Sequence, residues 1–338
     1  MSLPGDVAAA LSLSLEYVVG LASRADSQYR QFTLPKANGK RRVIHHPSRS
    51  LKALQRWLVV RYISDLPVHE AAKAYRHRLS IADNARIHAP FSYTVRLDIK
   101  RFFESISESD IAALLRTSSM AAQWSQDDFA FFLESVCYMG RLTIGAPSSP
   151  SLANAIFFPL DVKIAQLAED NGLIYTRYAD DLYFSSNVKM DLGWIEKAVS
   201  QVLADAVFPS GLQLNLAKSR KLSKKHRKIV TGLVITPQGT LSVGHSLKRR
   251  VRSLVYKVNT LTPSERKYLA GVLAYIRSVE PDFVNRLFLK YGTLTVSTAL
   301  HPTADAVSGG NEFPLQGSLK GVVPQLPPSE EALRLNRG

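Results

Sequence analysis

Paired aspartates stand at the centre of the segment LIYTRYADDLYFSS, residues 173–186. Two β-prone runs flank Asp180 and Asp181, and this pattern predicts a tight hairpin with both aspartates at its turn. Aspartates are also common in turns for purely structural reasons. The flanking strands favour a chemical role, because they would hold the two carboxylates on a rigid sheet.

A third aspartate, Asp98, ends the run YTVRLD at residues 93–98. The two-residue period of a strand puts Thr94, Arg96 and Asp98 on one face. Three carboxylates from two neighbouring strand ends can hold two Mg²⁺ ions, which prefer oxygen ligands and share their shell with substrate phosphates. Two such ions about 3.5–4 Å apart activate a hydroxyl group and stabilise a leaving phosphate. The carboxylates therefore predict metal-dependent chemistry on phosphate esters.

The charge of the chain favours an anionic partner. Its 338 residues include 43 basic and 28 acidic side chains, which give a formal net charge of +15 and a pI near 9.9. Between Asp205 and Glu265 lie 59 residues without an acid, and they hold twelve Lys or Arg side chains. Such a run is often only a solvated face, but its self-repulsion costs stability unless an anion relieves it. We therefore expect a phosphate-binding surface, with nucleic acid as the partner.

The single cysteine, Cys137, excludes an internal disulfide and a cysteine-rich zinc site. It lies in an apolar run, which fits packing better than chemistry, and a reducing cytoplasm is the expected location. Residues 1–22 contain two acids and no basic leader, which predicts an amphipathic helix and not a signal peptide. No uncharged stretch of 18 residues indicates a membrane span, so we expect no membrane partner.

The order of the predicted elements indicates an α+β protein with a separate helical unit. Residues 1–30 look helical. Residues 93–245 alternate short β-rich runs with helical segments, as an α/β or α+β core does. Residues 246–292 look like a helical unit in which Pro263 and Pro281 fall at helix starts.

Six segments occur in an order that resembles that of reverse transcriptases, over about residues 35–292. YADD and the upstream LDIKRFF are similar to motifs C and A of that family. The others are RRVIHHPSRSLKALQ at Arg41–Gln55, similar to the finger motifs, GAPSSPSLAN at Gly145–Asn154 (motif B), GLQLNLAKS at Gly211–Ser219 (motif D) and VTGLVI at Val230–Ile235 (motif E).

The resemblance implies a right-hand polymerase fold with fingers, an antiparallel-sheet palm and a helical thumb. It also implies an RNA-directed DNA polymerase. The expected domains are an N-terminal helix and fingers at 1–92, a palm with inserted finger elements at 93–245, a helical thumb at 246–295, and a flexible C-terminal tail, rich in Gly, Pro and Ser, at 296–338.

Two shorter signatures favour the retron type of bacterial reverse transcriptase. Asn84, Ala85 and His88 are similar to the Asn-Ala-x-x-His signature of retron enzymes, and Val230–Gly232 is similar to their Val-Thr-Gly signature. Taken alone, His88 would be interpreted as an ordinary capped or core histidine. Both signatures in a short chain, without an appended maturase or endonuclease domain, favour the retron type over a group II intron protein.

The resemblance also implies a metal site. Asp98 and Asp180 would bind metal most directly, Asp181 would be more auxiliary, and the backbone carbonyl of Ile99 would also face a metal. The expected cofactor is Mg²⁺, as two ions, with Mn²⁺ as an alternative.

Basic residues would bind the incoming triphosphate. Arg42, together with Lys40 or Arg41, would clamp its phosphates, because the guanidinium fork suits them. Lys218 matches the motif D lysine, a candidate proton donor to departing pyrophosphate, and the alternative is one more phosphate contact.

The sugar and base would meet aromatic and small residues. Phe103, five residues after Asp98, matches the steric gate against a ribose 2′-hydroxyl, and the alternative is packing beside Phe102. Ile144 stands where many relatives carry Gln, which removes an amide able to hydrogen-bond the nucleotide. Small residues that permit close backbone approach would line the floor of the site, namely Gly145, Ala146 and Pro147.

The implied partners are deoxynucleoside triphosphates, a cognate structured non-coding RNA of the msr-msd type with its branched DNA product (msDNA), and an effector or toxin protein in anti-phage defence. The residues expected to bind RNA are Asn84, His88, Lys248, Arg249, Arg250 and Arg252. Three alternatives stay open: a bacterial reverse transcriptase of the group II intron, diversity-generating or abortive-infection type, a non-catalytic RNA-binding scaffold, and a palm-type nucleotide cyclase. The basic thumb and GAPSSP disfavour the cyclase.

Overall fold

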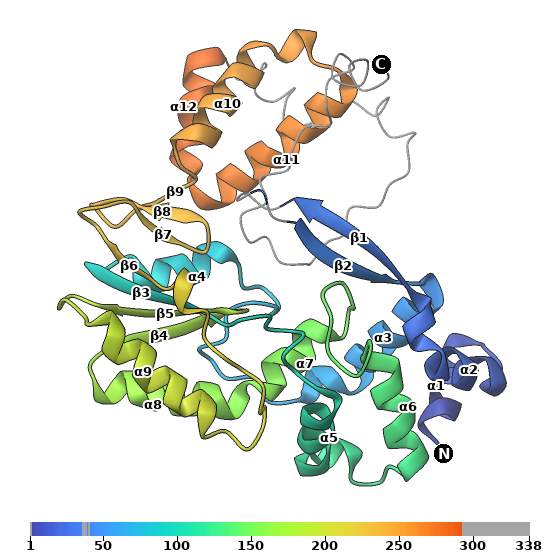
Figure 1. The fold of residues 1–338 in the computed structure, drawn as a ribbon. Coiled ribbons are helices and arrows are strands. Elements are labelled where there is room, and N and C mark those ends of the chain that lie inside the picture. Colours follow the sequence, from blue (N-terminus) through green and yellow to red (C-terminus); the bar gives the residue numbers. More distant parts are fainter. Residues whose placement is uncertain (1, 36–38, 40, 293–338) are drawn as a thin grey trace. The chain divides into compact units, whose positions relative to one another are not determined.

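The computed structural model describes residues 2–35, 39 and 41–292 (Figure 1). The predicted tail at 296–338 lies outside these residues. Within the described part, no single helix is long and apolar enough to cross a membrane. The first two helices meet that criterion only as a pair, and the pair is bent by 114°.

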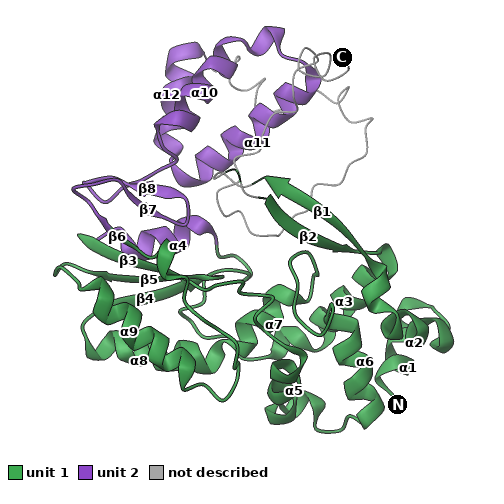
Figure 2. Cartoon of the chain, viewed as in Figure 1, with its two compact units in different colours: residues 1–79, 92–221 green, residues 80–91, 222–338 purple. Residues whose placement is uncertain are grey.

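The chain divides into two compact units, and the division differs from the predicted domain boundaries (Figure 2). Unit 1 contains residues 1–79 and 92–221, so the predicted fingers and most of the predicted palm form one body. Unit 2 contains residues 80–91 and 222–338. It therefore combines the predicted thumb with the last part of the predicted palm and with a short segment from the predicted fingers.

Several helices of unit 1 have a serine N-cap. For example, α5 and α6 begin at Ser107 and Ser125, each of which forms a capping box with an aspartate three residues later. The helices are α1 (Leu3–Leu11), α2 (Leu15–Ser23), α3 (Arg49–Arg61), α5 (Glu108–Thr117), α6 (Gln126–Val136), α7 (Ser149–Ile156), α8 (Phe158–Asp170) and α9 (Leu192–Ala204).

A four-stranded sheet in the order β4-β5-β3-β6 forms the predicted palm. Its strands are β3 (Tyr93–Asp98), β4 (Ile174–Tyr178), β5 (Asp181–Ser186) and β6 (Arg220–Ser223). The central strand β5 is buried along its whole length and runs antiparallel to both β3 and β4. Helices α8 and α9 lie along one side of the sheet, and α8 packs on β4 (Figure 1). Mixed helices and an antiparallel sheet confirm the predicted α+β class.

The predicted fingers carry a long hairpin, in which β1 (Tyr29–Pro35) pairs antiparallel with β2 (Arg41–Pro47). Helix α3 follows β2 at once, because Ser48 caps it by accepting a hydrogen bond from the backbone N–H of Leu51. The hydrophobic core of unit 1 runs without a break from α1 to the sheet. The hairpin and the carboxylate-bearing sheet therefore belong to one packed body.

Unit 2 joins one helix to a small sheet and a helical bundle. Helix α4 (Ile81–His88) packs on the antiparallel strands β7 (Lys228–Val230), β8 (Leu233–Ile235) and β9 (Leu241–Ser242). Helices α10 (His245–Tyr256), α11 (Pro263–Val279) and α12 (Pro281–Tyr291) enclose a second core around Val251, Leu273 and Phe283. Pro263 and Pro281 stand in the first turns of α11 and α12, as predicted.

Candidate active site

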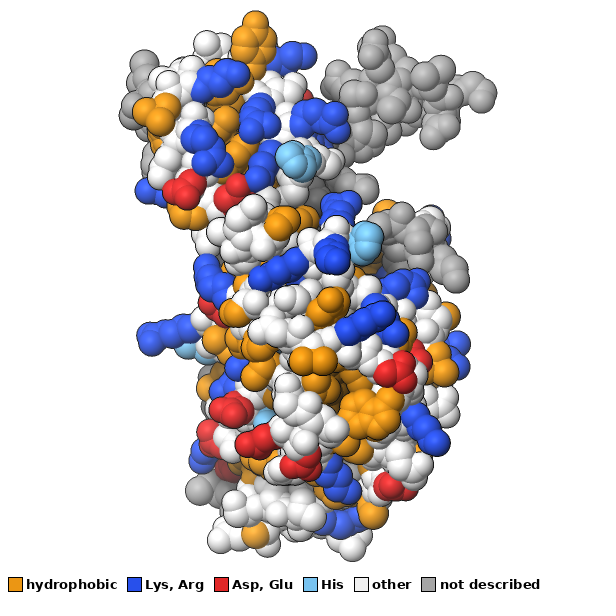
Figure 3. Space-filling model, turned by 90° about the vertical axis from the view of Figure 1, so that its left-hand side faces the viewer, with side chains coloured by type: hydrophobic (Ala, Val, Ile, Leu, Met, Phe, Trp, Pro, Cys, Tyr) orange, Lys and Arg blue, Asp and Glu red, His pale blue; other side chains and the backbone are white. Residues whose placement is uncertain are grey.

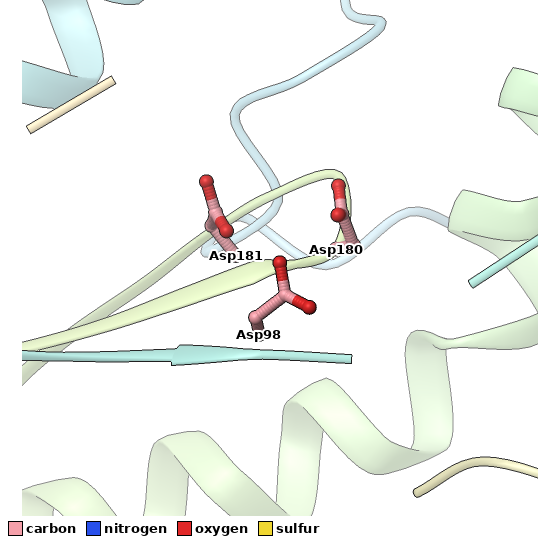
Figure 4. Close-up of side chains that lie close together, drawn as sticks. All are labelled: Asp98, Asp180 and Asp181. Carbon is pink, nitrogen blue, oxygen red and sulfur yellow. The ribbon is translucent and has the colours of Figure 1, made fainter. Parts of the chain in front are cut away.

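Three carboxylates meet at one end of the sheet in unit 1 (Figure 4). Asp98 is the last residue of β3 and Asp181 the first of β5, and the two are direct partners in the antiparallel register. Asp180 precedes β5 in the turn. One ligand oxygen from each residue lies within 4.8 Å of the other two. The structure therefore brings together the three aspartates that the sequence predicts.

The turn between β4 and β5 is tight and strained. Ala179 has a φ of +57°, in the left-handed region that side chains with a Cβ atom adopt rarely. The backbone oxygen of Asp180 accepts a hydrogen bond of 2.7 Å from the N–H of Ile99, just beyond the end of β3. The predicted hairpin is present, but Asp181 already belongs to β5, so of the two aspartates only Asp180 is a turn residue.

Asp98 and Asp181 each lie beside a basic side chain. Lys218 Nζ donates to both oxygens of Asp98, at 2.9 and 3.0 Å. Arg96 Nη2 lies 3.0 Å from Asp181 Oδ1, and the hydroxyl of Tyr183 donates to Asp181 Oδ2 at 3.2 Å. Sequence reasoning did not assign Arg96 or Tyr183 to the site. The strand period could have found both, since each stands two residues from a site aspartate on the same face.

The electrostatics of Asp98 suit a cation. Burial raises the pKa of this carboxyl, the hydrogen bonds from Lys218 lower it, and the charge of Asp180 raises it again, so the net shift is upward. A divalent cation would offset both the burial and the repulsion between the carboxylates. Because the donors are carboxylate oxygens, the set fits a hard divalent cation, and direct binding by Asp98 and Asp180 stays a prediction.

The motif B segment Gly145–Pro147 lies against strand β2. Gly145 has a φ of +115°, and a Cβ atom there would collide with the backbone oxygen of His45. The His45 N–H donates to the oxygen of Ile144 at 2.9 Å. Only glycine permits this close approach, so Gly145 joins motif B to the hairpin of the fingers. Contact of Gly145, Ala146 and Pro147 with a nucleotide stays a prediction.

The predicted triphosphate clamp lies on the same hairpin. Arg42 stands in β2 opposite Leu34 and is half-buried. Arg41 donates through Nε to Thr33 Oγ1 at 2.7 Å, a hydrogen bond within the hairpin. Arg42 is therefore the better candidate for binding the triphosphate. Lys40 lies outside the described residues.

Phe103 is half-buried between two aromatic rings. Its centroid lies 5.4 Å from that of Phe102 and 6.1 Å from that of Tyr75. It packs against the core of unit 1, yet part of the ring remains accessible. The steric gate therefore stays a prediction, as does a metal contact of the Ile99 carbonyl.

The Asn-Ala-x-x-His signature lies on α4, and its side chains face the interior of unit 2. Asn84, Ala85 and His88 are fully buried. Buried side chains do not reach a ligand at the surface, so their position does not support the prediction that Asn84 and His88 contact RNA. We correct it: they are core residues of unit 2, which is the alternative that the sequence left open for His88.

The Val-Thr-Gly signature forms the turn between β7 and β8. Thr231 and Gly232 have φ values of +47° and +85°, as a two-residue hairpin loop with two left-handed residues requires. Thr231 Oγ1 donates to the backbone oxygen of Ile81 at 2.7 Å, and Lys228 Nζ donates to that of His88 at 2.7 Å. The hairpin that carries Val-Thr-Gly therefore contacts α4, the helix that carries the other signature, from about 140 residues away in the chain.

Lys248 is less available to RNA than the sequence predicts. Its Nζ lies 2.5 Å from Glu280 Oε1, and both side chains are mostly buried. Glu280, just before α12, also accepts a hydrogen bond from the N–H of Val243. The stretch between Asp205 and Glu265 has no acid in its sequence, but the fold brings Glu280 to it.

The three arginines of α10 remain candidates for RNA contact. Arg249 and Arg252 are exposed, and Arg250 is half-buried with its guanidinium 5.1 Å from the ring centre of Tyr268. Figure 3 shows Lys and Arg side chains gathered on the upper part of the view, where Figure 1 places α10–α12. Their contact with RNA stays a prediction.

Comparisons with known proteins show what this chain is similar to. A family model described as reverse transcriptase (RNA-dependent DNA polymerase) matches residues 34–269. The retron Ec83 reverse transcriptase of Escherichia coli is 32% identical over 295 residues, which cover 84% of this chain and 93% of that protein. The retron Mx65 reverse transcriptase of Myxococcus xanthus is 32% identical over 302 residues, 83% of this chain and 69% of that protein. Among solved structures, apo telomerase from Candida tropicalis gives a TM-score of 0.49 at 10% identity, covering 78% of this chain and 57% of that chain.

The family match spans more than half of the chain and includes the three aspartates, Gly145 and Lys218. The α+β architecture with an antiparallel sheet is consistent with the right-hand polymerase fold. An RNA template and a DNA product are accordingly its macromolecular partners, and a divalent metal is its cofactor. This chain therefore belongs to the reverse transcriptase family, as an RNA-directed DNA polymerase of the bacterial retron type.

Proposed function

We propose that this enzyme copies a cognate, structured non-coding RNA of the msr-msd type into single-stranded DNA that stays branched from the RNA. Synthesis starts from an internal ribose 2′-hydroxyl. The observation that carries the proposal is the contact between the Val-Thr-Gly turn and α4, the helix that carries the Asn-Ala-x-x-His signature, where Thr231 donates a hydrogen bond to Ile81. Both signatures resemble those of retron enzymes, and curated relatives carry that name.

A start from an internal hydroxyl requires the RNA to be held in one pose. Phosphate contacts give affinity without register, so general charge is insufficient. RNA-binding modules obtain register from structured stems and from splayed bases. The exposed arginines of α10, Arg249 and Arg252, are our candidates for part of that surface.

The chemistry would use residues of unit 1. Asp98 and Asp180 would hold two Mg²⁺ ions, with Mn²⁺ as an alternative, and the ions would supply activation of the hydroxyl and stabilisation of the leaving pyrophosphate. Lys218, which hydrogen-bonds Asp98, would leave it to give a proton to the pyrophosphate. Arg42 would hold the triphosphate, and Phe103 would exclude a ribose 2′-hydroxyl.

The proposal includes a role in anti-phage defence, in the cytoplasm and together with an effector or toxin protein. Resemblance to retron enzymes supports this role, and a short inverted-repeat RNA locus beside an effector gene would support it further. Loss of phage resistance on deletion of the enzyme, with rescue by wild type and not by Asp180→Asn, is the expected result.

The branch itself is tested by co-expression of the enzyme with its adjacent RNA locus. Extracted nucleic acid is treated with RNase and then with debranching enzyme. We expect a DNA whose electrophoretic mobility shifts only after debranching. Asp180→Asn, expressed with the same RNA, should give no DNA and serves as the control.

Two other outcomes would reject parts of the proposal. Abundant DNA that starts only from 3′-hydroxyl groups would exclude the branched product and favour a group II intron, diversity-generating or abortive-infection type of reaction. RNA binding without any DNA synthesis would favour a non-catalytic scaffold.

A further inference from the structure

Arg177, in strand β4, carries a fully buried guanidinium in unit 1. Its Nη2 lies 2.6 Å from Asp161 Oδ2 and its Nε 2.9 Å from Asp161 Oδ1, so the pair is bidentate. The hydroxyl of Tyr175 also donates to Asp161 Oδ1, at 2.7 Å. Both members of the ion pair have no exposed surface. A buried pair of this kind contributes little net stability against apolar residues of the same size, so its presence calls for another reason.

The remaining donor, Arg177 Nη1, points to two other segments. It donates to the side-chain oxygen of Asn154 on α7 at 3.0 Å and to the backbone oxygen of Ala179 at 3.4 Å. Asn154 in turn donates to the backbone oxygen of Ala74 at 2.9 Å. The guanidinium also lies 4.4 Å from the ring centre of Phe157, which fixes its plane.

The backbone of Arg177 is held as firmly as its side chain. Its N–H donates to Ala71 and its oxygen accepts from Lys73, each at 2.8 Å. One residue therefore connects β4, α7, α8 and the segment around Ala71–Ala74. The Ala179 contact lies at the strained residue immediately before Asp180, the turn carboxylate.

We propose that Arg177 is a positioning residue for the metal-binding carboxylates. By holding the Ala179 carbonyl, it fixes the left-handed turn that presents Asp180 to Asp98. Through Asn154 it couples this turn to α7, the helix that follows Gly145–Pro147. The polymerase reaction needs the turn at Asp180 and the segment Gly145–Pro147 at fixed positions relative to each other. Arg177 fixes these positions without contacting substrate or metal.

Arg177→Lys tests the proposal, because lysine keeps the charge beside Asp161 but lacks the fork that reaches Asn154 and Ala179. The probe is Mn²⁺ alone, with the free ion measured by electron paramagnetic resonance, and the melting temperature is recorded in parallel. We expect Mn²⁺ affinity to fall about tenfold, as for other groups that orient metal ligands. Wild type and Asp180→Asn, in the same titration, define the binding that belongs to the carboxylates.

Leu160→Ala is the matched control, since Leu160 is buried on α8 next to Asp161 and its truncation loosens the core without touching the turn. It should lower the melting temperature and leave Mn²⁺ affinity unchanged. Unchanged affinity in Arg177→Lys would overturn the proposal. An equal loss in Leu160→Ala would also overturn it, because the effect would then come from general loosening.

If Arg177→Lys does not fold, the double variant Arg177→Met/Asp161→Leu removes both buried charges together, which is often tolerated. A folded double variant that binds Mn²⁺ weakly supports the proposal, and one that binds like wild type overturns it. The inference rests on metal binding by the carboxylates, and identical binding by wild type and Asp180→Asn would remove that premise independently of Arg177.

Discussion

The three site aspartates are not equivalent. Asp181 is held on both oxygens by protein donors, Arg96 and Tyr183, which suits an auxiliary role. Asp98 shares its oxygens with Lys218, a flexible and half-exposed side chain that can leave. Asp180 comes from the turn, where its position depends on the strained residue before it. Metal binding should therefore depend most on Asp98 and Asp180.

Asp180→Asn should abolish primer extension and leave RNA binding near the wild-type level. An amide is a poor substitute for an anionic Mg²⁺ ligand, while the basic surface is unchanged. Primer extension and filter binding, run side by side, measure the two properties. Asp170→Asn, at the exposed end of α8, is the control and should keep full activity. Primer extension by Asp180→Asn at the wild-type rate would contradict the assignment of Asp180 as a metal ligand.

Phe103→Ala should increase the use of ribonucleotides relative to deoxynucleotides by about tenfold or more, the discrimination that a close steric contact typically supplies. Phe103 stands five residues after Asp98, and the accessible part of its ring would crowd a 2′-hydroxyl. The measurement is the ratio of kcat/KM for the two substrates. Phe102→Leu changes the buried neighbour and should lower stability without changing the ratio. The same ratio in a folded Phe103→Ala enzyme would assign Phe103 to packing alone.

At the scale of elements, the sequence pattern predicted the features that depend on neighbouring residues, such as strand ends and helix starts. Alternation placed Asp98 at a strand end, and Pro263 and Pro281 marked helix starts correctly. Motif D marked Lys218, but its contact with Asp98 and the network of Arg177 were not predicted, because these contacts join chain segments that only the tertiary fold brings together. Lys218, for instance, is 120 residues from Asp98.

The same limit explains the errors. Asn84 and His88 were assigned to RNA because they belong to a retron signature, but they are buried on α4, which packs on β7–β9. Lys248 belonged to a stretch without acids, yet α12 brings Glu280 to it. Proximity in the chain is a weak guide to charge balance once helices pack against one another.

Lys228 should make the stability of unit 2 depend on pH. Its ammonium is buried under α4, where it donates to the oxygens of His88 and Phe91 at 2.7 and 2.8 Å. Burial, and to a lesser degree the charge of Lys224, lowers the pKa of Lys228 from 10.5 to about 8. Below that pKa the buried charge costs stability, and the cost is relieved between about pH 8 and 10.5, where the unfolded chain still holds the proton.

Lys228→Met lacks this titration. We expect the unfolding free energy of wild type, minus that of the variant, to rise by about 1–3 kcal/mol across that pH range, given about 1.4 kcal/mol for each pKa unit. Urea unfolding at several pH values measures the difference. Lys225→Met, at an exposed position, should show no such trend. A difference that stays flat or falls with pH would contradict the buried charge.

At the scale of the whole molecule, the net charge of +15 is expected to act through exposed arginines. Replacing Arg249 and Arg252 with Ala should weaken RNA affinity and flatten its salt dependence. Each lost phosphate contact should reduce the log–log slope by about 0.7–0.9. Binding titrations at several salt concentrations give that slope.

Lys248→Ala is the matched comparison on the same helix. Because Lys248 pairs with Glu280, its loss should lower the stability of unit 2 with little change in the salt slope. An unaltered slope in the double arginine variant would mean that these side chains are merely solvated.

Unit 2 is built from two separate stretches of chain, and this has a consequence for the order in which the protein is made. Helix α4 emerges from the ribosome first, but the strands that receive it lie beyond residue 221. During translation, the apolar face of α4 cannot pack on β7–β9 until residues 92–221 have been synthesised. A fragment that starts at residue 222 would likewise leave Thr231 and Lys228 facing an absent helix. Grafting this module onto another polymerase therefore requires two insertions and not one.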